Sequence, residues 1–271
     1  MIKFGICSEI FKDWNDINRT IEYVKKVGYH GLEIAPFTLA QYVTEIPNQV
    51  REQIRKKAEE VGLEIIGIHW VLVGPDGMHI NSPDQAVRKR TADYLVELVR
   101  FCADTGGRLI IFGSPKQRMV DENLSYQQAF DYAVETFRYA MPACQDYNVT
   151  ICMEPLTSLE TNFCTSAAET LELVKAVGHP NFQMMLDTKA MTPEKETRPE
   201  LIRKYAPYMR HYHANDSNLN GPGWGDVDFA PIFQALKEIN YDGYVSVEVF
   251  KFEPGPEAIA VKSLEYMRRF V

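Results

Sequence analysis

Residues 149–187, VTICMEPLTSLETNFCTSAAETLELVKAVGHPNFQMMLD, contain a strand, a helix and a second strand in succession. The runs Val149 to Glu154 and Gln183 to Asp187 are short and largely apolar, which is typical of buried strands. The segment between them has the length of a helix and closes at Gly178, a residue suited to the left-handed position after a helix end. Two strands joined by a helical crossover lie parallel in one sheet.

The same alternation runs from one end of the chain to the other and yields eight strands, each followed by a helical segment. The predicted strands are Lys3 to Cys7, Gly31 to Ala35, Glu64 to His69, Leu109 to Gly113, Val149 to Glu154, Gln183 to Asp187, Arg210 to His213 and Tyr244 to Val249. The clearest helix is Pro83 to Thr105, and Ser82 and Ser125 are predicted N-caps. Eight such units predict a single closed (β/α)8 barrel, and no linker divides the chain, so we expect one domain over residues 1–271.

Composition narrows the classes of function. Of the 271 residues, 45% are hydrophobic and 24% charged, as in ordinary folded domains, and the net charge of −8 argues against nucleic acid as a partner. Five scattered cysteines without a CxxC pair indicate reduced thiols. Neither a secretory leader nor a stretch long enough to span a membrane is evident, so we expect a cytoplasmic protein with no membrane partner.

Metal-binding residue types close four consecutive predicted strands: Glu154, Asp187, His213 and Glu248. Because the carboxyl ends of the strands form the reactive face of such a barrel, these side chains can meet near its axis. Three carboxylates gathered in a poorly solvated pocket would repel one another unless a cation joined them. Three oxygens and one imidazole suit Mn²⁺, the metal we expect, with Mg²⁺, Co²⁺ or Zn²⁺ as alternatives.

Each of these residues alone has a simpler explanation, since an acidic residue at a strand end often caps the next helix or lies in a surface loop. Four metal-compatible residues at four successive strand ends favour the shared site.

The chain resembles the xylose isomerase-like barrels of the sugar (phosphate) isomerase/epimerase superfamily, in the style of D-tagatose and L-ribulose 3-epimerases. The resemblance covers essentially the whole chain. Its most specific stretches are MEPL at 153–156 with Glu160, MLDT at 185–188, HYH at 211–213, PGWGDVDF at 222–229 and YDGYVSVE at 241–248.

This resemblance implies a divalent-metal-dependent isomerase or epimerase of a keto sugar or related small carbohydrate. Glu154, Asp187, His213 and Glu248 would hold the metal, and Glu154 and Glu248 would also act as paired acid and base beside a metal-stabilised enediolate. Glu160 matches a position that hydrogen-bonds a substrate hydroxyl. Barrels of this kind commonly form homo-oligomers.

Two positions depart from the pattern of typical 3-epimerases. Ala190 stands where those enzymes have a histidine, and Leu219 stands where they have an arginine. Lys189 could replace either contact by binding an anionic or keto group, or it could be a solvated loop lysine. The identity of the sugar, and whether it is phosphorylated, stays open.

Other strand-end residues have both functional and structural interpretations. His69 and Trp70 could contact a bound sugar, although Trp70 could equally plug the barrel rim. His211 shares the inward direction of His213 but lies deeper, so we expect it to support the metal ligands rather than bind the metal. Glu33 lies within a strand and needs a buried partner, and Cys152 is expected to be core.

Other functions use the same scaffold. The first alternative is a metal-dependent lyase of the inosose or dehydroshikimate dehydratase type, which begins with the same proton abstraction. The second is a non-catalytic sugar-binding homologue. A hydrolase resembling endonuclease IV is disfavoured, because that chemistry needs more histidines and a basic surface, whereas this chain has six histidines and is acidic.

Overall fold

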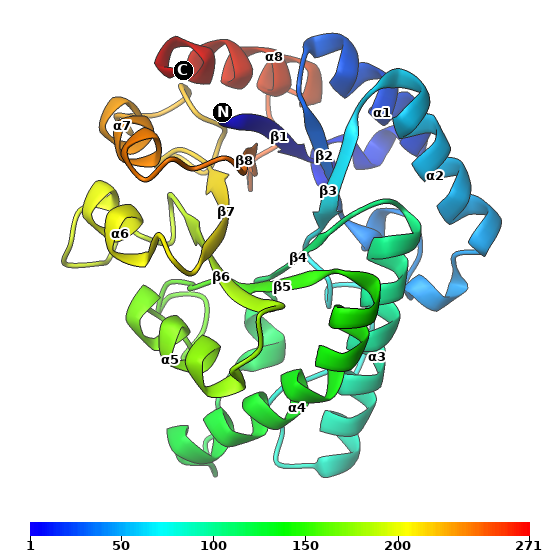
Figure 1. Ribbon diagram of the computed structural model, residues 1–271, viewed down its shortest axis with the longest axis vertical. Coiled ribbons are helices and arrows are strands. Elements are labelled where there is room, and N and C mark those ends of the chain that lie inside the picture. The colour runs from blue at the N-terminus through cyan, green and yellow to red at the C-terminus, as the bar shows by residue number, and fades with distance from the viewer.

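A closed barrel of eight parallel strands forms the centre of the computed structural model, which describes residues 1–271 (Figure 1). Each strand pairs with its neighbours along the chain, and β8 closes the barrel by pairing with β1, as in Ile6 opposite Val247. The strands are β1 Lys3–Cys7, β2 Gly31–Ile34, β3 Glu64–Ile68, β4 Leu109–Phe112, β5 Thr150–Met153, β6 Phe182–Asp187, β7 Met209–Ala214 and β8 Tyr244–Val247. The predicted (β/α)8 barrel is confirmed.

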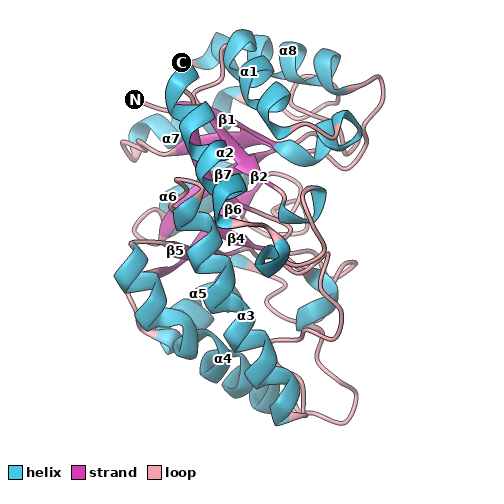
Figure 2. Cartoon of the chain, turned by 90° about the vertical axis from the view of Figure 1, so that its right-hand side faces the viewer, coloured by secondary structure: helices cyan, strands magenta, loops and turns pink.

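Helices surround the barrel and follow the strands in order. They are α1 Ile17–Val27, α2 Asn48–Val61, α3 Gln85–Asp104, α4 Tyr126–Tyr147, α5 Ala167–Val177, α6 Arg198–Tyr205, α7 Ala230–Glu238 and α8 Pro256–Met267. Five short 3-10 helices lie in the loops or at the C-terminus: η1 Ser8–Trp14, η2 Pro36–Thr38, η3 Val43–Glu45, η4 Pro115–Arg118 and η5 Arg268–Phe270. Many of the long loops gather on one side of the molecule, at the right in Figure 2. None of the helices combines the length and apolar character needed to cross a bilayer.

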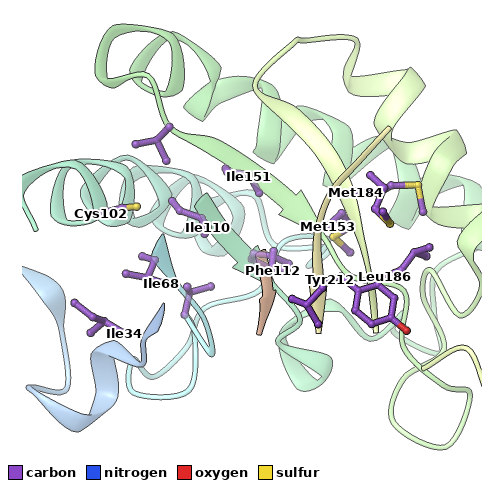
Figure 3. Close-up of a cluster of buried hydrophobic side chains, with 14 of the residues drawn as sticks. Ile34, Ile68, Cys102, Ile110, Phe112, Ile151, Met153, Met184, Leu186 and Tyr212 are labelled. Carbon is purple, nitrogen blue, oxygen red and sulfur yellow. The ribbon is translucent and has the colours of Figure 1, made fainter. Parts of the chain in front are cut away.

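Alternation along the strands separates two apolar regions. Ile151, Met153 and Leu186 belong to a cluster of 67 buried residues that joins strands to helices, part of which Figure 3 shows. Cys152, which lies between Ile151 and Met153, and Met185, which precedes Leu186, face the other way. They pack with Ile111 in a separate small cluster inside the barrel. By the same alternation, the side chains that follow at the ends of β5 and β6 point to the barrel axis.

Helix ends follow the sequence signals with one exception. Gly178 ends α5 in the left-handed region with φ +67°, and Ser125 caps α4 by accepting a hydrogen bond from the Gln128 N–H. The predicted N-cap Ser82 is wrong. Asp84 caps α3, because its Oδ1 accepts the N–H of Ala86 at 2.8 Å and the helix begins later than expected, at Gln85.

Five strands, β2, β3, β4, β5 and β8, end one or two residues earlier than predicted. His69, Glu154 and Glu248 therefore follow β3, β5 and β8 directly. The barrel still holds their backbones, since the Glu154 N–H donates to the Phe112 carbonyl and the Glu248 N–H to that of Ala214. These side chains therefore start from fixed points on the rim.

Candidate active site

Four side chains from successive strand ends converge at the mouth of the barrel. Glu154, Asp187, His213 and Glu248 are all buried, and each offers a ligand atom that lies within 4.8 Å of the other three. Residues separated by up to 94 positions in sequence meet because β5, β6, β7 and β8 are neighbours in the barrel. The structure thus brings together the four residues that the sequence singled out.

The imidazole of His213 is held between two carboxylates. Its Nδ1 lies 3.1 Å from Glu248 Oε2, and its Nε2 lies 3.1 Å from Glu33 Oε2. A histidine that ligates a metal through one ring nitrogen usually donates the other N–H to a carboxylate or carbonyl, which fixes the tautomer. His213 has this arrangement, with Nδ1 toward the cluster and Nε2 toward Glu33.

The electrostatics of the cluster also suit a cation. Burial raises the pKa of Glu154 well above its usual value, and the charges of Glu248 and Asp187 raise it further. Burial and the charge of Glu248 raise the pKa of Asp187 to about 6. Burial would also raise the pKa of Glu248, but the adjacent His213 lowers that pKa below its usual value. A divalent ion among these oxygens would relieve the repulsion, so the donor set could hold one.

Asp187 is clamped on both carboxylate oxygens. The backbone N–H of Ala190 donates to Oδ1 at 2.8 Å, and the Asn215 amide donates to Oδ2. Ala190, the position of the missing histidine, therefore orients a predicted metal ligand through its backbone. Asn215 was not recognised in the sequence, although its place two residues after His213 was a usable signal.

A cavity of about 260 Å³ opens beside the cluster. Its lining includes Trp70, Glu154, Glu160, Lys189, Glu248 and Phe250. Lys189 Nζ lies 2.7 Å from Glu160 Oε1 and 3.9 Å from the centre of the Phe250 ring. Lys189 is therefore not a solvated loop lysine: its side chain is 16% exposed and faces the cavity.

Two of the predicted site residues lie behind this lining. His69 is fully buried and its Nε2 lies 2.7 Å from Glu9 Oε2, an acidic partner in η1 that sequence reasoning missed. His211 is also fully buried, with Nε2 2.7 Å from Glu33 Oε1, so Glu33 bridges His211 and His213. His69 is thus placed in a buried pair rather than on the cavity wall.

Loop residues complete the rim. Leu219, where typical 3-epimerases have an arginine, has φ +71° and its carbonyl accepts the N–H groups of Phe250 and Lys251. Gly113 lies against Glu154, and a Cβ at this position would come within 2.5 Å of Glu154 Oε2. The absence of a side chain at Gly113 leaves room for that carboxylate.

Comparison with known proteins identifies the family of this barrel and several similar relatives. Residues 21–270 match the family described as xylose isomerase-like TIM barrel, and the chain belongs to this family. It is 30% identical over 233 residues to a D-psicose 3-epimerase of Agrobacterium fabrum, covering 85% of this chain and 78% of the relative. It is 32% identical over 253 residues to an L-ribulose 3-epimerase of Methylomonas sp., covering 89% and 82%. A crystal structure of D-psicose 3-epimerase from Clostridium cellulolyticum H10 with D-tagatose shares the fold, with a TM-score of 0.85, 24% identity and 99% of both chains covered.

Proposed function

We propose that this chain is a divalent-metal-dependent epimerase that inverts C3 of a ketose or a related small carbohydrate. One observation carries the proposal: Glu154 and Glu248 line the same cavity and belong to the same four-residue cluster with Asp187 and His213. The names of the curated relatives, D-psicose and L-ribulose 3-epimerase, support the substrate class.

Glu154, Asp187, His213 and Glu248 would hold the metal, with Mn²⁺ as the expected ion. When bound, it would polarise the substrate carbonyl and so acidify the neighbouring C–H group. Removal of that proton needs a carboxylate against the C–H bond, and its return on the other face needs a second one. Glu154 and Glu248, which come from β5 and β8, are the two candidates.

The cavity wall would orient the sugar. Glu160 and Lys189 form an ion pair on the wall, so together they offer an acceptor and a donor to adjacent hydroxyl or carbonyl oxygens. In this proposal Lys189 supplies the contact that Ala190 and Leu219 do not. Trp70 would provide an apolar wall, while His69 and His211 act from behind through Glu9 and Glu33.

The test is a panel of free and phosphorylated ketoses incubated in D₂O with Mn²⁺. We expect one or more of the ketoses to gain deuterium at C3 and form its epimer without loss of water. Glu154→Gln and Glu248→Gln should each abolish inversion, whereas Glu172→Gln, a change in an exposed surface pair, should not.

The other outcomes separate the alternatives. A product that has lost one water would identify a lyase, and binding of a sugar without deuterium exchange would identify a non-catalytic sugar-binding protein. Exchange that survives in both glutamine variants would refute the acid/base assignment.

A further inference from the structure

Glu154 and Glu248, the two carboxylates proposed as acid and base, are held very differently. Both oxygens of Glu248 have partners: the indole Nε1–H of Trp70 donates to Oε1 at 2.8 Å, and His213 Nδ1 lies 3.1 Å from Oε2. By contrast, the guanidinium of Arg118 donates to the backbone carbonyl of Glu154, and no protein group donates to the Glu154 carboxylate. Glu248 is therefore held on both oxygens by protein partners, whereas the Glu154 carboxylate is held by none.

Trp70 is itself held firmly by its neighbours. Its ring stacks near-parallel on Phe37, at 5.6 Å between ring centres and 18°, and on Phe250, at 6.2 Å and 25°. These two partners come from η2 and from the loop after β8, so three separate loops define the position of the indole.

The backbone of Trp70 adds a second observation. Its φ of +52° lies in the left-handed region, which is unfavourable for a bulky side chain. Such a conformation persists only where the surroundings enforce it, and such residues cluster at functional sites. Here it accompanies an indole N–H that points at one carboxylate of the site.

We propose that Trp70 is a positioning residue for Glu248: its indole N–H holds Oε1 so that Oε2 stays directed at the cluster with His213. This role goes beyond an aromatic wall for the sugar, and its catalytic part rests on the proposed epimerase function. It predicts that Trp70 contributes to metal affinity through Glu248, a property that can be measured without any substrate.

The first experiment is a calorimetric titration of the metal-free protein with Mn²⁺. Trp70→Phe keeps an aromatic ring but removes the N–H, and we expect it to weaken Mn²⁺ binding about tenfold, as is usual for partners of metal ligands. Trp14→Phe is the control, because Trp14 packs against Phe11 and edge-on against Tyr23, at 4.8 and 5.2 Å between ring centres, and is not part of the cavity lining. It should bind Mn²⁺ as the unaltered chain does.

A double-mutant cycle tests whether the effect passes through Glu248. In a Glu248→Gln background, Trp70→Phe should cause at most a twofold further loss of Mn²⁺ affinity. Unchanged affinity in the single Trp70→Phe variant, or the same tenfold loss in the Glu248→Gln background, would overturn the proposal.

A second measurement does not depend on the folding of Trp70→Phe. The chain has three tryptophans, so its ¹⁵N-indole NMR signals can be assigned with Trp14→Phe and Trp224→Phe. The Trp70 indole signal should be protected from solvent exchange and should shift in Glu248→Gln but not in Glu160→Gln. An indole signal that ignores Glu248→Gln would refute the hydrogen bond.

Turnover provides the last readout. If a ketose is epimerised, Trp70→Phe should lower kcat about tenfold and change KM by less than about twofold, because the N–H contacts Glu248 rather than the sugar. A rise in KM with unchanged kcat would mean that Trp70 serves only as a wall. Should no ketose react, the Mn²⁺ and NMR results still decide the role of Trp70.

Discussion

Replacement of Glu33 by glutamine should weaken metal binding, although Glu33 is not one of the four proposed metal ligands. Glu33 is fully buried in β2, and its two oxygens lie 2.7 Å from His211 Nε2 and 3.1 Å from His213 Nε2. Burial would raise the pKa of Glu33, but the two histidines hold that pKa well below its usual value, so the group is an anion. A glutamine of similar size removes the charge and one of the two acceptors.

The size of the effect follows from that geometry. A glutamine can accept from only one of the two histidines, so one charge-assisted hydrogen bond is lost, which is worth about 1.5–3 kcal/mol. Since each 1.4 kcal/mol is a factor of ten, we expect Glu33→Gln to weaken Mn²⁺ binding about 10-fold to 100-fold.

Calorimetric titration of the metal-free protein with Mn²⁺ is the assay, and circular dichroism verifies that the variant is folded. The control is Glu64→Gln, because the Glu64 side chain is 58% exposed and pairs with Lys3 at the other end of the barrel. Folded Glu33→Gln protein that binds Mn²⁺ within twofold of the unaltered chain would refute the argument that Glu33 orients His213.

Three further predictions concern the same site. Gly113→Ala should lower kcat about a hundredfold with little change in melting temperature, because the added Cβ would displace the Glu154 carboxylate. Near-normal turnover in this variant would contradict the contact between residue 113 and Glu154. Lys189→Met should raise KM about tenfold and leave Mn²⁺ affinity unchanged, with Lys175→Met as an exposed control, and an unchanged KM would exclude Lys189 from substrate binding. Mn²⁺ affinity should increase with pH, and Mn²⁺ binding should release protons. Burial lowers the pKa of His213, but Glu33 and Glu248 raise that pKa well above its usual value, so the metal must displace a proton from His213. The pKa of Asp187 is raised to about 6, so Asp187 takes up a proton below about that pH. Calorimetry in buffers of different ionisation enthalpy measures this release, and a pH-independent affinity would count against it.

Much of the fold and the centre of the site could be predicted from the sequence. Strict alternation of strands and helices specifies parallel neighbours, and the barrel rule then brings Glu154, Asp187, His213 and Glu248 to one rim. Errors of one or two residues at strand ends did not matter, because alternation along each strand fixes the direction of these side chains.

The partners across the barrel could not be predicted in this way. Glu33 and His211 are 178 positions apart, as are Trp70 and Glu248, and their contact depends on the register and diameter of the closed sheet. Glu9 was missed because β1 ends at Cys7 and the chain turns into η1, where strand periodicity no longer applies. Gly113 carries no functional group, so its role emerges only from the position of Glu154.

Crystals grown with Mn²⁺ and measured at the manganese absorption edge would test the central claim most directly. The account predicts one anomalous peak per chain at the mouth of the barrel, within about 2.3 Å of oxygens of Glu154, Asp187 and Glu248 and of Nδ1 of His213. No peak at this position, or a peak that persists when His213 is replaced by alanine and Asp187 by asparagine, would contradict it.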